Sequence, residues 1–380
     1  MSEDELPGAN EVPVTSTRDQ EDLRRRLEAW LATQLPAGAE PTVPPLDSPA
    51  ANGWSSETLL FDASWTDPEA GGRRTERLVA RVAPDPAAMP VFPHYDMPAQ
   101  ARVMQVAADL SGIPVPAVRW VEPDAAVLGE PFFVMERVDG DVPPDIPPYD
   151  MGGWVLEATP EQRARLDAST VDVLAALHVT TEHVDQLGFL QYDWPGETAL
   201  ERHLAHERHY WSWIADGRAS ATVERVEAWL TAHWPAHEGP PLLSWGDSRY
   251  GNVMYRDFEP VAVLDWEMAA VAPPEMDLAY LAYMHAYFES IAHRYELPGL
   301  PDLGRLGALA THYERATGYT PRDLGFYVVY NAYRHLLITL RIALRRMHFG
   351  ELVHTEHLDD ALDPSHLELL EELMATGADA

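Results

Sequence analysis

The segment 242–280 constrains the fold of this chain more than any other stretch. An apolar run, Pro241–Ser244, ends in a polar loop that is rich in glycine, aspartate and asparagine. Two β-rich runs follow, Val253–Tyr255 and Val261–Leu264, and the turn-forming sequence DFEP separates them. Two such runs around a short turn predict a β-hairpin. The polar loop therefore lies between an apolar strand and a hairpin.

Three residues of this segment predict a phosphoryl-transfer site. Asp247 and Asn252 lie five residues apart in the polar loop, and Asp265 ends the hairpin. Kinases use one carboxylate to orient the acceptor hydroxyl, and an amide and a second carboxylate to hold Mg²⁺. The spacing therefore predicts a catalytic role for Asp247 and metal binding by Asn252 and Asp265. Two ordinary surface turns could also place Asp and Asn at this spacing, but the hairpin context favours the functional interpretation.

The motifs WGDSRYGN (245–252) and DWE (265–267) resemble the HGDxxxxN and DWE signature of the aminoglycoside phosphotransferase family. This family includes choline kinase-like and homoserine kinase-like enzymes, and its actinobacterial branch also carries WGD in place of HGD. The resemblance implies a two-lobed, protein-kinase-like α+β fold with a β-rich N-lobe and a mostly helical C-lobe. It also implies ATP and Mg²⁺ as cofactors and a small-molecule hydroxyl as acceptor. Trp245 stands where most members have histidine.

The charge of the chain bears on its partners. A net charge of −34 argues against nucleic-acid binding, which needs basic surface to neutralise phosphates. The acidic residues are spread along the chain, which favours a role in solubility over steering of cationic substrates. All 27 basic residues are arginine, so a kinase mechanism here must work without the usual ATP-binding lysine. Cysteine is absent, which excludes disulfides and thiol nucleophiles.

The composition of successive segments predicts the domain organisation. Residues 1–17 are acidic and lack apolar periodicity, which predicts a disordered arm. We expect an N-terminal nucleotide-binding lobe with a leading helix at 18–140, and a catalytic and acceptor-binding lobe at 141–380. No apolar stretch is long enough to span a membrane and no signal peptide is evident, so we expect a cytoplasmic protein with no membrane partner. No feature predicts an oligomeric state.

The loop 52–58 is the expected phosphate-binding turn. A Gly/Ser turn between two strands can lay backbone N–H groups over phosphates, although the same sequence also fits an ordinary hairpin. The family has a GGxSN-like loop here, so the resemblance assigns ATP contacts to four residues: Asn52, Gly53, Ser55 and Ser56. Arg81, at the end of the strand 78–82, stands where the family places its ATP-contacting base. The family's helix glutamate has no counterpart in 97–110, where the nearest match is Gln100.

The sequence PFFVMERVDG (131–140) predicts a buried strand that ends in a polar break. It resembles the PFxVMExxxG segment of the family, whose backbone pairs with the adenine edge. The resemblance therefore implies adenine contacts at Glu136 and Val138. A core strand followed by a turn would have the same sequence pattern.

The remainder of the chain is predicted to be mostly helical. Apolar periodicity indicates helices at 160–178, 275–295, 303–317, 321–347 and 364–374. Asp277, in the first turn of one of them, could act electrostatically or bond the catalytic loop, and the family supports the second role. Arg249 could meet phosphate or the Asp247 carboxylate. The histidines His203, His206 and His209 recur at every third residue, a step that drifts off one helix face, so they are more simply packing residues than metal ligands.

Three functions from different classes fit these features. The first is an ATP-dependent small-molecule kinase, and it requires the Asp, Asn and Asp that are present. The second is a nucleotide-binding pseudokinase or scaffold without transfer activity, suggested by the missing lysine. The third is a metal hydrolase that uses the histidines. A protein kinase fits less well, because no APE-type activation segment is found. Within the family, acceptors include aminoglycosides, choline, homoserine, macrolides and hydroxyacyl thioesters, and the sequence does not select among them.

Overall fold

The computed structural model describes residues 18–47, 55–68, 71–355 and 357–376. The predicted arm 1–17 and the loop residues Asn52 and Gly53 lie outside the described residues. The chain divides into two compact units. Of the described residues, the smaller unit contains those from 18 to 106 and Val115–Asp139, and the larger contains Ala107–Pro114 and those from Gly140 onward.

The smaller unit is built on a four-stranded antiparallel sheet in the order β1-β2-β4-β3. Its strands are β1 (Glu57–Asp67), β2 (Gly72–Val82), β3 (Val118–Glu122) and β4 (Phe132–Glu136). In β1, buried residues alternate with more exposed ones, the pattern of a strand with one covered face. The described part of β4 is buried at every position except Glu136, as expected for a central strand.

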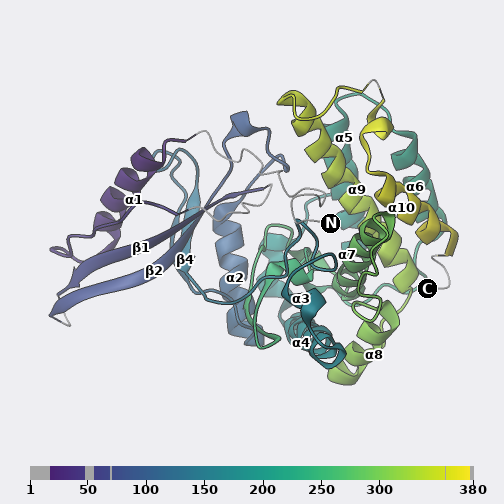
Figure 1. Cartoon of the computed structure of the whole chain (residues 1–380), viewed down its shortest axis with the longest axis horizontal. Helices are drawn as coiled ribbons and strands as arrows, with labels where there is room; N and C mark the ends of the chain where they lie inside the picture. Colours follow the sequence, from purple (N-terminus) through teal and green to yellow (C-terminus); the bar gives the residue numbers. More distant parts are fainter. Residues whose placement is uncertain (1–17, 48–54, 69–70, 356, 377–380) are drawn as a thin grey trace. The chain divides into compact units, whose positions relative to one another are not determined.

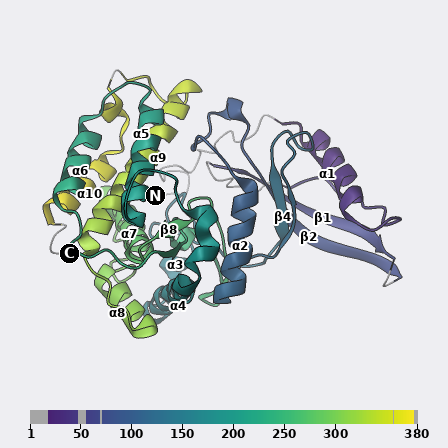
Figure 2. The same cartoon turned by 180° about the vertical axis from the view of Figure 1, so that it is seen from behind.

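One face of this sheet packs against α1 (Gln20–Gln34), as Figures 1 and 2 show. The apolar stripe Leu23, Leu27, Trp30 and Leu31 on α1 is buried in one cluster with β-sheet side chains that include Phe61, Trp65 and Phe132. Asp19 caps the helix by accepting a hydrogen bond from the Asp22 N–H. In both views α2 (Met97–Ser111) lies on the other side of the sheet from α1.

The larger unit is mostly helical. Its α-helices are α3 (Trp154–Glu157), α4 (Pro160–His178), α5 (Ala199–Ala215), α6 (Ala221–Ala232), α7 (Glu275–Arg294), α8 (Leu306–Thr317), α9 (Leu324–His348) and α10 (Pro364–Thr376). The α4 helix begins with a capping box between Thr159 and Gln162, with Pro160 in its first turn. The long helices α7 and α9 lie side by side in both views (Figures 1 and 2). Among the described residues, no helix has the length and apolar content needed to cross a membrane.

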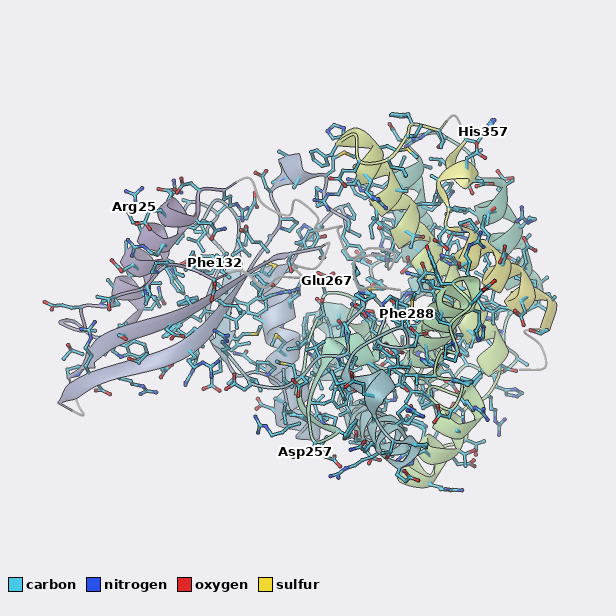
Figure 3. The ribbon with its side chains drawn as sticks, in the orientation of Figure 1. Arg25, Phe132, Asp257, Glu267, Phe288 and His357 are labelled. Atoms are coloured by element: carbon cyan, nitrogen blue, oxygen red, sulfur yellow. The ribbon has the colours of Figure 1, made fainter. Side chains whose placement is uncertain are left out.

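Four short strands of the larger unit hold the candidate site. Strands β5 (Leu242–Ser244) and β8 (Ala270–Ala272) form one antiparallel pair. Between them in the sequence lies the hairpin of β6 (Val253–Arg256) and β7 (Glu259–Val263). The hairpin turns at Asp257 and Phe258, which both have positive φ, as a type I′ turn requires. Figure 3 labels Asp257 at this turn and Glu267 on the loop that follows the hairpin.

The α+β fold class and the predicted hairpin are both found in the structure, and the predicted helix bounds lie within three residues of the observed ones. Strands β3 and β8 were not predicted. Strand β8 has only three residues, which is too short to show periodicity, and it forms by pairing with β5.

Candidate active site

The polar loop 245–252 holds Asp247 at the centre of a hydrogen-bonded cluster. Asn252, at the end of the loop, donates from Nδ2 to the Asp247 carboxylate at 2.6 Å and to its backbone carbonyl at 3.0 Å. Arg249 donates from Nε to the other carboxylate oxygen of Asp247 at 3.1 Å. Tyr280, on α7, lies near the same carboxylate, and burial, followed by the Asp247 charge, raises the pKa of its hydroxyl well above the ordinary value. Asp247 is 9% exposed, so these contacts fix a largely buried carboxylate.

Arg249 bridges two carboxylates. Besides Asp247, its guanidinium pairs with Asp145, which lies in the proline-rich segment before α3. Burial alone would lower the pKa of Arg249, but the carboxylates of Asp145 and Asp247 raise it well above its ordinary value. The guanidinium fork suits this double pairing, because it can offer separate N–H groups to each acid. Of the two partners expected for Arg249, the structure shows the Asp247 carboxylate.

Asp277 holds the start of the same loop from the first turn of α7. Its fully buried carboxylate accepts hydrogen bonds from the backbone N–H groups of Trp245 (2.8 Å) and Gly246 (2.9 Å). The Ser244 hydroxyl donates to it at 2.9 Å, and His178 contacts it at 3.1 Å. Burial raises the pKa of Asp277, but the His178 hydrogen bond and the two amides outweigh this and hold the pKa below its usual value.

Gly246 can be replaced by no other residue without a shift of the loop. Its φ is +87°, a left-handed conformation that glycine adopts without strain. A Cβ atom at this position would lie 2.0 Å from the carbonyl oxygen of Met268, on the loop that carries DWE. The glycine therefore allows the backbone of the polar loop 245–252 to approach that of the loop that carries DWE.

Asp265 and Asn252 are connected through the backbone. Leu264, which precedes Asp265, donates its N–H to the Asn252 carbonyl at 2.8 Å. Asp265 itself has φ +58°, a conformation for which aspartate is enriched. Since the Asn252 amide nitrogen bonds Asp247, Oδ1 is the side-chain atom of Asn252 that would contact a metal ion. An amide oxygen and a carboxylate are hard oxygen donors of the kind that Mg²⁺ takes, so these residues fit the expected ion.

Two buried tryptophans lie against this segment. The Trp245 indole N–H donates to the Leu264 carbonyl at 2.8 Å, and the Trp266 indole N–H donates to the Val263 carbonyl at 3.1 Å. Their rings lie 6.1 Å apart. The residue that replaces the family's histidine therefore bonds the backbone directly before Asp265.

Arg334 is a buried cation beneath the loop that sequence reasoning missed. It lies on α9, is 2% exposed, and donates to the Gly246 carbonyl at 3.2 Å and to Asn331 at 3.0 Å. The buried Glu207 lies 3.5 Å away, and the guanidinium stands 5.4 Å from the centre of the Tyr280 ring. Burial raises the pKa of Glu207, but neighbouring His206 and then Arg334 outweigh this and lower it to about 2. The sequence feature that could have indicated Arg334 is its position as a charged residue on the apolar stripe of a predicted helix.

The proposed ATP residues of the smaller unit fall at one end of its long strand pair. Ser55 and Ser56 immediately precede β1, and Arg81 of β2 pairs in register with Thr58. Arg81 also donates from Nη1 to the Thr58 hydroxyl at 3.0 Å. Ser56 is 1% exposed, and its Oγ makes no hydrogen bond within the described structure. The structure therefore brings Arg81 to the described end of the loop 52–58.

Glu136 ends β4, and Val138 follows it. The Glu136 carboxylate pairs with Arg119 at 2.6 Å on the partly exposed side of the sheet. Its backbone N–H donates to Ala117 at 3.0 Å. The Glu136 side chain is thus occupied within the sheet, so any contact with adenine would come from backbone groups, as the resemblance implied.

The three histidines at every third residue have packing partners. His203 is buried and contacts the Tyr330 hydroxyl at 2.7 Å, and burial lowers its pKa to about 3. His206 stacks on Tyr192 with ring centroids 4.0 Å apart. Within the ranges that the structure describes, no group of three or more histidine, aspartate or glutamate side chains is arranged to hold a metal ion.

Known proteins resemble this chain in sequence or in fold. Acyl-CoA dehydrogenase family member 11 of Rattus norvegicus is 27% identical over 223 residues, which are 55% of this chain and 26% of the relative. The chain thus spans about a quarter of that curated relative. A putative aminoglycoside phosphotransferase from Ralstonia eutropha superposes with a TM-score of 0.60 at 22% identity, covering 93% of this chain and 97% of the other.

A second solved structure is a thermostable mutant of aminoglycoside phosphotransferase APH(4)-Ia in a ternary complex with AMP-PNP and hygromycin B. It matches with a TM-score of 0.52 at 14% identity, covering 93% of this chain and 99% of the other. At these identities the superpositions show the fold, which is the expected kinase-like one. A model of the phosphotransferase enzyme family matches residues 48–314, well over half of the sequence and the whole of the polar loop and hairpin. The chain belongs to the phosphotransferase enzyme family.

Proposed function

We propose that this protein is an ATP-dependent small-molecule kinase that transfers the γ-phosphoryl group to a hydroxyl of its acceptor. The observation that carries the proposal is the cluster around Asp247. Asn252 bonds the Asp247 carboxylate, and Leu264 bonds the Asn252 backbone directly before Asp265. Asn252 is thereby bonded both to the Asp247 carboxylate and to the backbone directly before Asp265, so two hydrogen bonds connect the segments that carry the three residues phosphoryl transfer requires.

Asp247 is assigned as the residue that orients the acceptor hydroxyl and accepts its proton. Arg249 and Asn252 each bond one of its oxygens, so the carboxylate is held in one orientation before substrate arrives. Such preorganisation supports transfer, because a loose transition state gains mostly from positioning and charge neutralisation. Asn252 and Asp265 would hold Mg²⁺, which supplies neutralisation of phosphate charge when it is bound.

Within the smaller unit, we assign the nucleotide contacts to Ser55, Ser56, Arg81 and the backbone at Glu136 and Val138. From the sequence, we assign nucleotide contacts to Asn52 and Gly53 as well. Arg81 provides the cation that lysine provides elsewhere, and its fork can contact two phosphate oxygens. The AMP-PNP complex of the hygromycin-bound relative supports a nucleotide role for this fold.

The names of the relatives indicate which compounds to test as acceptors. One structural relative binds hygromycin B, and a curated relative is named for acyl-CoA chemistry. We therefore include aminoglycosides and hydroxyacyl-CoA thioesters, together with choline, homoserine and macrolides. Incubation with ATP, Mg²⁺ and each compound, followed by mass spectrometry, would identify a phosphorylated product and the position of its phosphate.

The decisive variant is Asp247→Asn. We expect it to retain Mg·ATP binding and to lose transfer by roughly 10²–10⁴-fold, the usual contribution of a positioned proton acceptor. The matched control is Asp257→Asn at the exposed hairpin turn, where asparagine also tolerates a positive φ. Near-normal turnover in Asp247→Asn would remove Asp247 from the mechanism. Nucleotide binding by the wild-type protein without transfer to any acceptor would favour the alternative function, a nucleotide-binding scaffold.

A further inference from the structure

Trp245 connects two segments of the candidate site with one side chain. Its backbone N–H bonds Asp277, and its indole N–H bonds the carbonyl of Leu264, directly before Asp265. The Trp245 side chain is fully buried, so its N–H would be left without a partner if this bond were lost. The residue lies two positions before Asp247. One indole thus fixes the start of the catalytic loop to the approach of the second predicted metal ligand.

The chemistry of the two rings explains how tryptophan can stand where histidine is common. The five-membered ring of imidazole has the same attachment and size as the pyrrole half of indole. When the two rings are superposed from Cβ outward, histidine Nε2 occupies the place of tryptophan Nε1, and both can donate an N–H. The indole of Trp245 also has Trp266 as a neighbour, with the two ring centres 6.1 Å apart.

We propose that Trp245 is a positioning residue for the metal site, and that its indole N–H, rather than its bulk, places Asp265. The inference rests on the proposed function, because it takes Asp265 as a ligand of Mg²⁺. A partner that orients a metal ligand from behind typically changes metal affinity by about 10–100-fold when it is removed. The Trp245 hydrogen bond acts on the residue before the ligand, which places it in this class.

The test separates the N–H from the ring. Trp245→Phe keeps an aromatic ring and removes the donor, whereas Trp245→His keeps a donor and removes the six-membered ring. The control is Trp229→Phe on α6, which deletes a similar indole hydrogen bond, 2.9 Å to the Met374 carbonyl, away from the loop. Calorimetric titration of Mn²⁺ into protein saturated with ADP measures metal affinity without turnover, and thermal unfolding of each variant measures stability.

We expect Trp245→Phe to bind Mn²⁺ about 10–100-fold more weakly than the wild-type protein. Trp245→His should bind within about threefold of wild type despite a lower melting temperature, and Trp229→Phe should bind as wild type does. Equal affinity in Trp245→Phe and Trp229→Phe would overturn the inference, and so would a histidine variant as weak as the phenylalanine variant. If Trp245→Phe does not fold, benzothienylalanine at position 245 replaces the N–H with sulfur at constant shape, with the same expected loss.

The proposed function can fail separately. Wild-type protein that binds Mn²⁺·ADP but phosphorylates no acceptor would refute the kinase assignment, while the affinities of the two Trp245 variants would still decide the role of the indole. Wild-type protein in which ADP does not enhance Mn²⁺ binding would overturn the inference together with the assignment of Asp265 to the metal.

Discussion

The substitution Asp277→Asn should release the start of the catalytic loop. One carboxylate oxygen accepts from Ser244 and Gly246, both at 2.9 Å. The other accepts from the Trp245 N–H at 2.8 Å and contacts His178 at 3.1 Å. Asparagine has the same shape, but its amide nitrogen must face a backbone N–H in either orientation. At least one charge-assisted hydrogen bond is therefore lost and the others weaken.

The expected magnitude follows from these contacts. Hydrogen bonds to a charged group contribute about 1.5–3 kcal/mol each. His178 can change tautomer and accept a hydrogen bond from the new amide, so we expect that contact to be kept. The estimated loss therefore consists of one hydrogen bond from a backbone N–H and the weakening of one further bond. The local opening free energy of the loop should fall by about 2–4 kcal/mol. Ser244→Ala removes one hydroxyl donor and keeps the charge and the other contacts, so it should lower this free energy by less, about 1.5 kcal/mol.

Hydrogen exchange read by mass spectrometry measures this local free energy, because protection of peptides spanning 242–252 reports opening of the loop. The pH dependence provides a second check. The pKa of Asp277 is held below its ordinary value of 3.8. Its stabilisation is thus complete above pH 4 and is lost as pH falls through the folded pKa. The difference between Asp277→Asn and wild type should be constant from pH 6 to 8. A difference below about 1 kcal/mol would refute this role.

Three further predictions test other parts of the site. Asp265→Ala should abolish the Mg²⁺ dependence of ATP binding in calorimetry, because it removes one of few carboxylate ligands; unchanged dependence would place the metal elsewhere. Arg81→Lys should raise the KM for ATP and lower kcat, since lysine lacks the fork; wild-type kinetics would show that another arginine binds the phosphates. Burial, then the Glu289 carboxyl, raises the pKa of Asp150 to about 7, so stability should fall by about 2–4 kcal/mol between pH 4 and 8. Asp150→Asn should remove most of that fall in denaturation experiments, and an unchanged slope would contradict it.

The parts of the site that the sequence predicts are those that depend on local spacing. Asp247 and Asn252 are five residues apart in one loop, and the hairpin that follows has a period and a turn that can be read directly. Their hydrogen bond is a short-range consequence of that loop. The bounds of α4 are likewise local, because its capping box and terminal residues are visible in the sequence.

The parts that could not be predicted depend on residues distant in the sequence. Arg334 reaches Gly246 from a helix 88 positions away, and Asp145 reaches Arg249 across 104 positions. Neither contact leaves a periodic signal, because a single polar residue within an apolar stripe does not show which group it bonds. The Trp245 contact could not be predicted either, because its partner Leu264 has an apolar side chain and accepts the hydrogen bond through its backbone carbonyl.

The absence of lysine gains a physical interpretation from these distant contacts. Two arginines bond the loop near Asp247, the partly buried Arg249 and the buried Arg334, and burial opposes the charged form of each. A lysine in either place could lose its proton at neutral pH, because burial can lower a lysine pKa by several units. Arginine keeps its charge with a large margin. The cations that hold this loop therefore keep their charge across the physiological pH range.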